Sequence, residues 1–144
     1  MSWRAICLNQ IPQDEQSGKH AQYPYVCPAG ALTIGWGRNI DRTHGGKGIS
    51  LATANQMLAE DLDECADDLA AIFSRWGDFS DRRKAALVNV RFQVGPGGFR
   101  KFRLMIAAID RGDWDAAADQ LLNSALHQQA TARTVRRAGE LRQG

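Results

Sequence analysis

The stretch from Cys27 to Gly37, Cys-Pro-Ala-Gly-Ala-Leu-Thr-Ile-Gly-Trp-Gly, constrains the fold more than any other part of this chain. It sets three glycines and a proline around a short run of β-branched and aromatic residues. Ala31 to Trp36 therefore reads as a short strand, and Pro28 to Gly30 as the turn that starts it. Taken alone, this pattern fits a structural hairpin. The acidic pair Asp14-Glu15 just upstream favours a chemical role for this segment.

Helical periodicity dominates the rest of the N-terminal half. The spacing predicts a short helix over Trp3 to Gln10, which Pro12 interrupts. Ser50 caps a long helix in which apolar residues recur at three- and four-residue steps from Leu51 to Ile72. The six acids of the segment Glu60 to Asp68 fall on its other face.

The C-terminal half predicts four more helices. Ser80 caps one that runs to about Val94, is apolar almost all round and ends at the Gly95 to Gly98 segment. A second covers Phe99 to Arg111, and Asp113 caps the third. Thr131 caps a last helix.

These elements predict an α+β fold in a single domain. A small N-terminal lobe over about residues 12–50 carries a short antiparallel sheet, and a linking helix spans about 50–73. The helical lobe takes 74–144 together with the first helix. A length of 144 residues suffices for one sizeable core. A cleft between two lobes is a common ligand site.

Composition is that of a soluble globular protein, with 44% hydrophobic and 24% charged residues. The apolar runs are too short to cross a bilayer, and the N-terminus lacks the apolar segment of a signal peptide. We therefore expect synthesis in a cytoplasm.

The cysteines and histidines predict no metal site. Three cysteines at spacings of 20 and 38 fit neither a disulfide framework nor a zinc pattern. Cys7 and Cys65 have apolar neighbours and are expected to be packed thiols, whereas Cys27 lies in the turn, where it could be reactive. The three histidines are scattered without ligand spacing.

Positive charge gathers at the end of the chain, in Arg133, Arg136, Arg137 and Arg142. One interpretation is a solvated basic helix; the other is contact with a polyanion such as a cell wall or nucleic acid. On the second interpretation, Arg136, Arg137 and Arg142 form an exposed patch.

Several motifs together resemble the phage-type lysozymes, glycoside hydrolase family 24, called endolysins in phages. Their motif is a Glu, then an Asp or Cys, then five residues and a Thr in a Thr-Ile-Gly-aromatic-Gly run. Cys27 and the run Thr33 to Gly37 match it. The resemblance covers nearly the whole chain and also includes Leu87 to Gly95, Gly112 to Trp114, and the spaced Ser124, Gln129 and Arg133.

The chain departs from the family pattern around the glutamate. Glu15 is followed by Gln16 where the family has Gly, and eleven residues precede Cys27 where the family has eight. Three residues are thus inserted between Gln16 and Tyr23. Arg38 stands where the family often has His.

The resemblance implies a set of catalytic residues. Glu15 is the expected general acid, Cys27 stands at the Asp or Cys position, and Thr33 is expected to hold the attacking water. Judged from the residues alone, the alternatives are a solvated surface Glu, a half-buried turn cysteine and an ordinary strand residue. Asp14 and His20 are substitutes for the acid, and the favoured alternative for each is an ordinary exposed side chain.

Further residues fall near positions that contact the sugar chain in that family. Arg133 corresponds to an Arg that pairs with the catalytic Glu; the alternative is a cation at a helix end. Phe92 and Phe102 serve equally well as core residues. The expected sugar contacts are Asn39, Phe92, Phe102 and Gln120.

The resemblance further implies hydrolysis of the β-1,4 bond between N-acetylmuramic acid and N-acetylglucosamine in peptidoglycan, in lysis of a bacterium by a phage or prophage. The protein is expected to be a monomer that uses no metal or cofactor and binds no nucleic acid. It is expected to stay in the cytoplasm until the membrane is permeabilised. The alternatives are a lytic transglycosylase, which needs only the acid, and a non-catalytic wall-binding protein.

Overall fold

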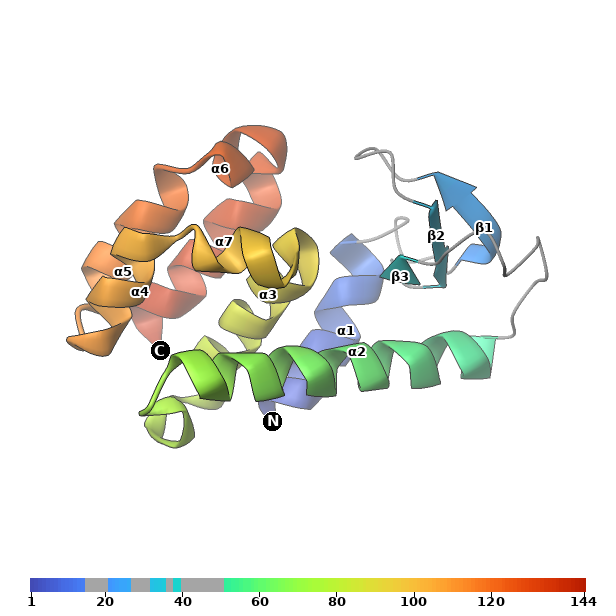
Figure 1. Cartoon of the computed structure of the whole chain (residues 1–144), viewed down its shortest axis with the longest axis horizontal. Helices are drawn as coiled ribbons and strands as arrows, with labels where there is room; N and C mark the ends of the chain where they lie inside the picture. Colours follow the sequence, from blue (N-terminus) through green and yellow to red (C-terminus); the bar gives the residue numbers. More distant parts are fainter. Residues whose placement is uncertain (15–20, 27–31, 36–37, 40–50) are drawn as a thin grey trace. The chain divides into compact units, whose positions relative to one another are not determined.

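The computed structural model describes residues 1–14, 21–26, 32–35, 38–39 and 51–144 (Figure 1). The chain divides into two compact units. The first joins Met1–Cys7 to Glu64–Gly144, and the second is Leu8–Asp63. The division falls within two helices, α1 and α2, so each of them contributes to both units.

The elements follow one another as three strands between the first two helices, and then a run of helices to the C-terminus. They are α1 (Trp3–Asp14), β1 (Ala21–Val26), β2 (Leu32–Gly35), β3 (Arg38–Asn39), α2 (Leu51–Ile72), the 3-10 helix η3 (Trp76–Asp78), α3 (Asp81–Arg100), α4 (Arg103–Asp110), α5 (Trp114–Leu122), α6 (Ala125–Gln129) and α7 (Thr131–Gln143).

The three strands form an antiparallel sheet in the order β1-β2-β3. Thr33, in the central strand, is opposite Tyr25 of β1 and Asn39 of β3. The register of β1 shifts between Ala21 and Tyr25, the segment that contains Pro24. Because proline has no N–H to donate, an irregular ladder at this point is the expected result.

The fold class expected from the sequence, α+β, was wrong: the described part of the chain is mainly helical. Its strands have only six, four and two residues, whereas α2 alone has 22 and α3 has 20. Such short strands offer little area for a core of their own, since a small sheet is independently stable only with a hydrophobic face or with a helix packed against it. Helices therefore supply the buried core that the structure describes.

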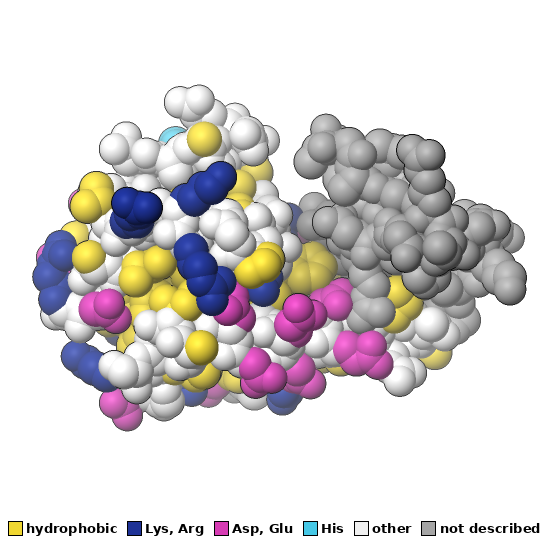
Figure 2. All heavy atoms as spheres, in the orientation of Figure 1, with side chains coloured by type: hydrophobic (Ala, Val, Ile, Leu, Met, Phe, Trp, Pro, Cys, Tyr) yellow, Lys and Arg dark blue, Asp and Glu magenta, His cyan; other side chains and the backbone are white. Residues whose placement is uncertain are grey.

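Helix α2 has the two faces that its periodicity predicts. Its apolar stripe is buried, with Leu62 and Leu69 fully inaccessible to solvent and Leu58 nearly so. Four of the six acids are exposed on the other side, namely Glu60, Asp63, Glu64 and Asp67, and Figure 2 shows acidic side chains along this helix. Asp68 departs from the prediction, because it is half-buried and contacts Arg91 of α3. Burial of the stripe, rather than helix propensity alone, stabilises a helix of this length.

The core of the first unit is built around α3. Ser80 caps this helix as predicted, its Oγ accepting the backbone N–H of Arg83 at 3.2 Å. Every residue from Ala85 to Arg91 is buried, as expected for a central helix that is apolar almost all round. Asp113 is likewise confirmed as the cap of α5, through the N–H of Ala116 at 3.0 Å.

The end of α3 differs from the sequence prediction. Gly95 has φ 78° and ψ 172°, so the regular helix does break there, but a further helical turn continues to Arg100. That left-handed φ favours glycine. Phe99 belongs to this turn and not to a helix over Phe99 to Arg111, because α4 begins only at Arg103.

Two other helix boundaries also differ. Helix α1 continues through Pro12 to Asp14, since a proline so near the C-terminal end removes one backbone hydrogen bond without preventing the last turn. Thr131 does not cap α7: it is the first helical residue, and its hydroxyl donates to the carbonyl of His127 at 2.8 Å.

None of the helices in the described ranges is both long and apolar enough to cross a membrane.

Candidate functional site

Two of the three predicted catalytic residues, Glu15 and Cys27, lie outside the described residues. The third, Thr33, lies in β2, and its backbone is in register with that of Asn39 in β3. A predicted catalytic residue and a predicted sugar contact are thus neighbours across one strand pair.

The two candidate aromatic sugar contacts lie in the first unit. Phe92, on α3, is half-buried. Phe102, also half-buried, is the residue that precedes α4, and its ring centroid is 6.2 Å from that of Phe99 with an interplanar angle of 61°. This edge-to-face contact fixes one side of the Phe102 ring and leaves part of its surface to solvent. Gln120, on α5, is half-buried as well.

Arg133 has a buried partner that the sequence prediction missed. Its Nε and Nη2 atoms both donate to Oδ1 of Asn89, at 3.1 and 2.9 Å. Asn89 is completely buried on α3, whereas Arg133 is half-buried on α7. The signal that could have found this pair is an amide within an otherwise apolar run, since a buried polar group needs a hydrogen-bond partner.

The predicted basic patch on the last helix does not form. Arg137 is only 2% exposed, and its Nε lies 3.0 Å from Oε2 of Glu140. Arg142 pairs with Asp119 of α5 at 2.5 Å. Arg136 and Arg137 are successive residues, about 100° apart around the helix, so they cannot share one exposed face.

Two thiols are buried, as their apolar neighbours predicted. Cys7 and Cys65 are both free cysteines. The Sγ of Cys7 donates to the carbonyl oxygen of Ala85 at 3.4 Å, and burial raises the pKa of this thiol to about 12. A thiol with so high a pKa stays protonated near neutral pH and is not a nucleophile.

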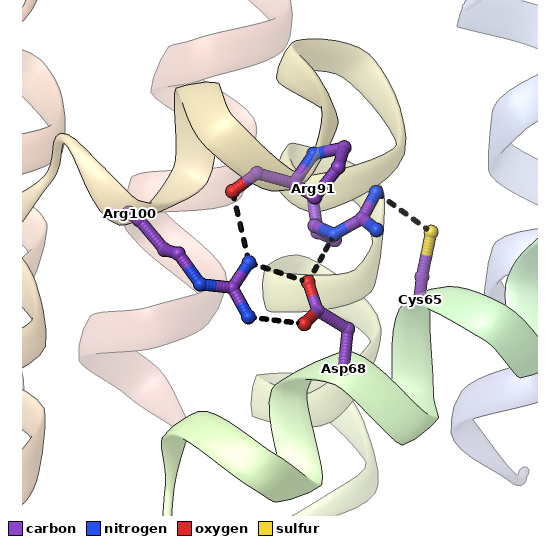
Figure 3. A network of polar contacts seen from close by, with 5 residues as sticks. Cys65, Asp68, Arg91 and Arg100 are labelled. Atoms are coloured by element: carbon purple, nitrogen blue, oxygen red, sulfur yellow. Dashed lines mark hydrogen bonds and ion pairs between the residues drawn. The ribbon is translucent and has the colours of Figure 1, made fainter.

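A second polar network, absent from the sequence prediction, joins α2 to α3 (Figure 3). The carboxylate of Asp68 accepts from Arg91 Nε at 2.7 Å and from Arg100 Nη1 at 3.0 Å, and its other oxygen accepts from Arg100 Nη2. Hydrogen bonds from Arg100, together with those from Arg91, lower the pKa of Asp68 to about 2. Arg91 Nη1 also donates to Cys65 Sγ at 3.7 Å.

Within the described ranges, no group of three or more His, Cys, Asp or Glu side chains is arranged to hold a metal ion. The polar groups described above are instead paired with one another, through amide, guanidinium and carboxylate contacts.

Comparison with known proteins identifies the family. The family model described as "Phage lysozyme" matches residues 16–140, which is most of the chain. The chain belongs to the phage lysozyme family. This family consists of lytic enzymes that act on peptidoglycan.

One relative of this chain is the "Pre-baseplate central spike protein Gp5" of Enterobacteria phage T4. The two are 31% identical over 103 residues, which are 69% of this chain and 18% of the relative. The chain thus spans less than a fifth of that protein's length.

The family match includes Cys27, Thr33 and all the predicted sugar contacts, but it begins one residue after Glu15. The motif around Thr33 and the later helices therefore carry the family assignment.

Proposed function

We propose that this phage lysozyme is a muramidase that hydrolyses the β-1,4 bond between N-acetylmuramic acid and N-acetylglucosamine. The observation that supports this most is the family match over residues 16–140, which contains the Cys27 to Gly37 motif. The register of Thr33 with Asn39 agrees with it, because it brings the backbones of two expected site residues together.

In the proposed mechanism, Glu15 donates a proton to the leaving glycosidic oxygen, since cleavage needs a protonated acid at that atom. Thr33 holds the attacking water through its hydroxyl, and Cys27 helps to orient that water or to stabilise the developing positive charge. Phe92 and Phe102 stack on sugar rings, while Asn39 and Gln120 supply hydrogen bonds. The enzyme acts as a monomer.

Glu15→Gln tests the role of the acid. The variant keeps the size of the side chain but cannot donate a carboxylic proton, so release of soluble fragments from purified peptidoglycan should fall below detection. Asp14→Asn is the matched control and should retain wild-type activity. Cleavage by Glu15→Gln at near wild-type rate, with an unchanged circular dichroism spectrum, would move the acid elsewhere.

The product distinguishes hydrolysis from transglycosylation. Hydrolysis adds a water to each cleaved bond, whereas a lytic transglycosylase leaves an anhydro sugar, which is lighter by one water. Mass spectrometry of the released fragments should show the hydrated product. Anhydro sugars alone would replace the muramidase proposal with the transglycosylase alternative.

A non-catalytic wall-binding protein is the second candidate, favoured by one observation. The family match begins after Glu15, and the segment between that residue and Cys27 is three residues longer than the family pattern. If this length displaces the acid, the protein should sediment with purified walls and release no fragments from them.

We further propose that the enzyme reaches the wall from the cytoplasm after the membrane has been breached. Added from outside, it should lower the turbidity of Gram-negative cells only when the outer membrane has been permeabilised. Equal lysis of intact cells would contradict this route.

A further inference from the structure

The carboxylate of Asp68 holds together two segments of α3 that the break at Gly95 separates. Arg91 precedes the break and Arg100 follows it, yet both donate to the same carboxylate on α2. Arg100 Nη1 also donates to the carbonyl oxygen of Pro96 at 3.0 Å, which closes the turn after the break (Figure 3). One side chain of α2 thereby fixes the position of a turn whose backbone departs from regular helix.

A residue of this turn, Phe99, packs against the ring of Phe102. Phe99, fully buried within the turn, packs edge-on against Phe73 on one side, with centroids 6.2 Å apart, and contacts Phe102 on the other. The backbone N–H of Phe102 donates to the carbonyl oxygen of Phe99 at 3.0 Å. Any displacement of the turn must therefore move the Phe102 ring.

The two arginine partners of Asp68 differ in how far solvent reaches them. The side chain of Arg91 is 8% exposed and that of Asp68 18%, so water replaces their contact poorly. Charge-assisted hydrogen bonds are stronger than neutral ones, and they hold a fixed geometry. Arg100, with a side chain 49% exposed, is free to turn into solvent once the carboxylate is neutralised.

We propose that Asp68 is a positioning residue for saccharide binding, which holds the turn from Pro96 to Lys101 so that Phe102 presents its ring in one place. This rests on the proposed function, because Phe102 contacts sugar only if the chain binds the glycan strand. Asp68 itself touches no substrate in this account. It acts through Arg100, Phe99 and finally Phe102.

The first measurement is hydrogen exchange of backbone amides in the folded protein, which requires no substrate. In Asp68→Asn, amides from Gly97 to Phe102 should exchange about tenfold faster, as expected when charge-assisted hydrogen bonds to a partly buried carboxylate are lost. Amides of α5 and α7 should stay at the wild-type rate. Asp67→Asn is the matched control, since Asp67 is an exposed carboxylate next to it on the same helix.

The second measurement is the dissociation constant for a soluble hexamer of N-acetylglucosamine, by calorimetry. Asp68→Asn and Phe102→Ala should each weaken binding about fivefold, the range expected for one aromatic contact. The double variant should bind no more weakly than Phe102→Ala, because both changes remove the same contact. Asp68→Glu, which keeps the charge, should restore part of the affinity.

Three outcomes would overturn the proposal. They are a further loss of affinity on adding Asp68→Asn to Phe102→Ala, faster exchange throughout the unit, and unchanged exchange between Gly97 and Phe102. If the wild-type protein binds the hexamer but does not cleave walls, the muramidase function is contradicted and the positioning role of Asp68 is not. A wild-type protein that does not bind it would contradict saccharide positioning even if exchange in the turn responds as expected.

Discussion

Arg133 directs two N–H groups at a single oxygen of Asn89, an amide buried 44 residues earlier in the chain. The pair joins α7 to α3, the central helix of the first unit. A completely buried amide oxygen is stable only when it accepts hydrogen bonds, and Arg133 supplies two of them. The arginine expected to pair with Glu15 thus has a structural role within the helical unit.

Asn89→Ala should lower the free energy of unfolding by about 2 kcal/mol, because it removes the acceptor for a half-buried guanidinium. Urea denaturation followed by circular dichroism measures this loss. Asn123→Ala, at an exposed asparagine, is the control and should change stability by less than about 0.5 kcal/mol. Equal losses in the two variants would mean that the Arg133 contact does not stabilise the fold.

Arg137→Gln should destabilise the protein far more than Arg136→Gln, although the two residues are adjacent. Replacing a buried guanidinium that is paired with the half-buried Glu140 removes the attraction between the two charges and costs about 3 kcal/mol. Arg136 is exposed, so its replacement should cost less than about 0.5 kcal/mol. Thermal melting of both variants checks this, and similar melting temperatures would contradict the burial of Arg137.

Asp68 should make stability depend on pH in acid. Its pKa is about 2 in the folded protein, below the ordinary aspartate value of 3.8, so the folded state binds the proton less readily than the unfolded state. The stabilisation is therefore complete above pH 3.8 and is lost as the pH falls towards 2.

Asp68→Asn provides the comparison for this titration. Its stability should lie below that of the wild type at pH 6, and the difference should shrink steadily between pH 4 and pH 2. A difference that stays constant over that range would show that the carboxylate charge is not the source of the effect.

Cys27→Asp should retain wall cleavage, whereas Cys27→Ala should lose most of it. The reason is that the motif of the phage-type lysozymes has either Asp or Cys at this position, and both side chains can be anionic beside a developing positive charge. Rates of fragment release from purified peptidoglycan decide the matter. Full activity of Cys27→Ala would leave Thr33 to hold the water alone.

What could be predicted from the sequence is mostly local. Ser80 and Asp113 were identified as caps because a capping side chain bonds a backbone N–H only three residues away. The stripe of α2 was found because helical periodicity decides which residues share a face. The family motif could be identified from the sequence because its residues lie within one short segment.

Tertiary structure alone decided which charges are buried and what they touch. Arg136 and Arg137 are adjacent residues of the same type, and it is the packing of the helix that buries Arg137 and leaves Arg136 exposed. Asp68 lies among six acids within nine residues, and nothing local distinguishes it from Asp67. Its partners are 23 and 32 residues away, so its role depends on how α3 continues beyond Gly95 and packs against α2. Long-range contacts of this kind are determined by how the helices pack. Periodicity predicts which face of a helix is buried, but it does not predict which residues of other helices contact that face.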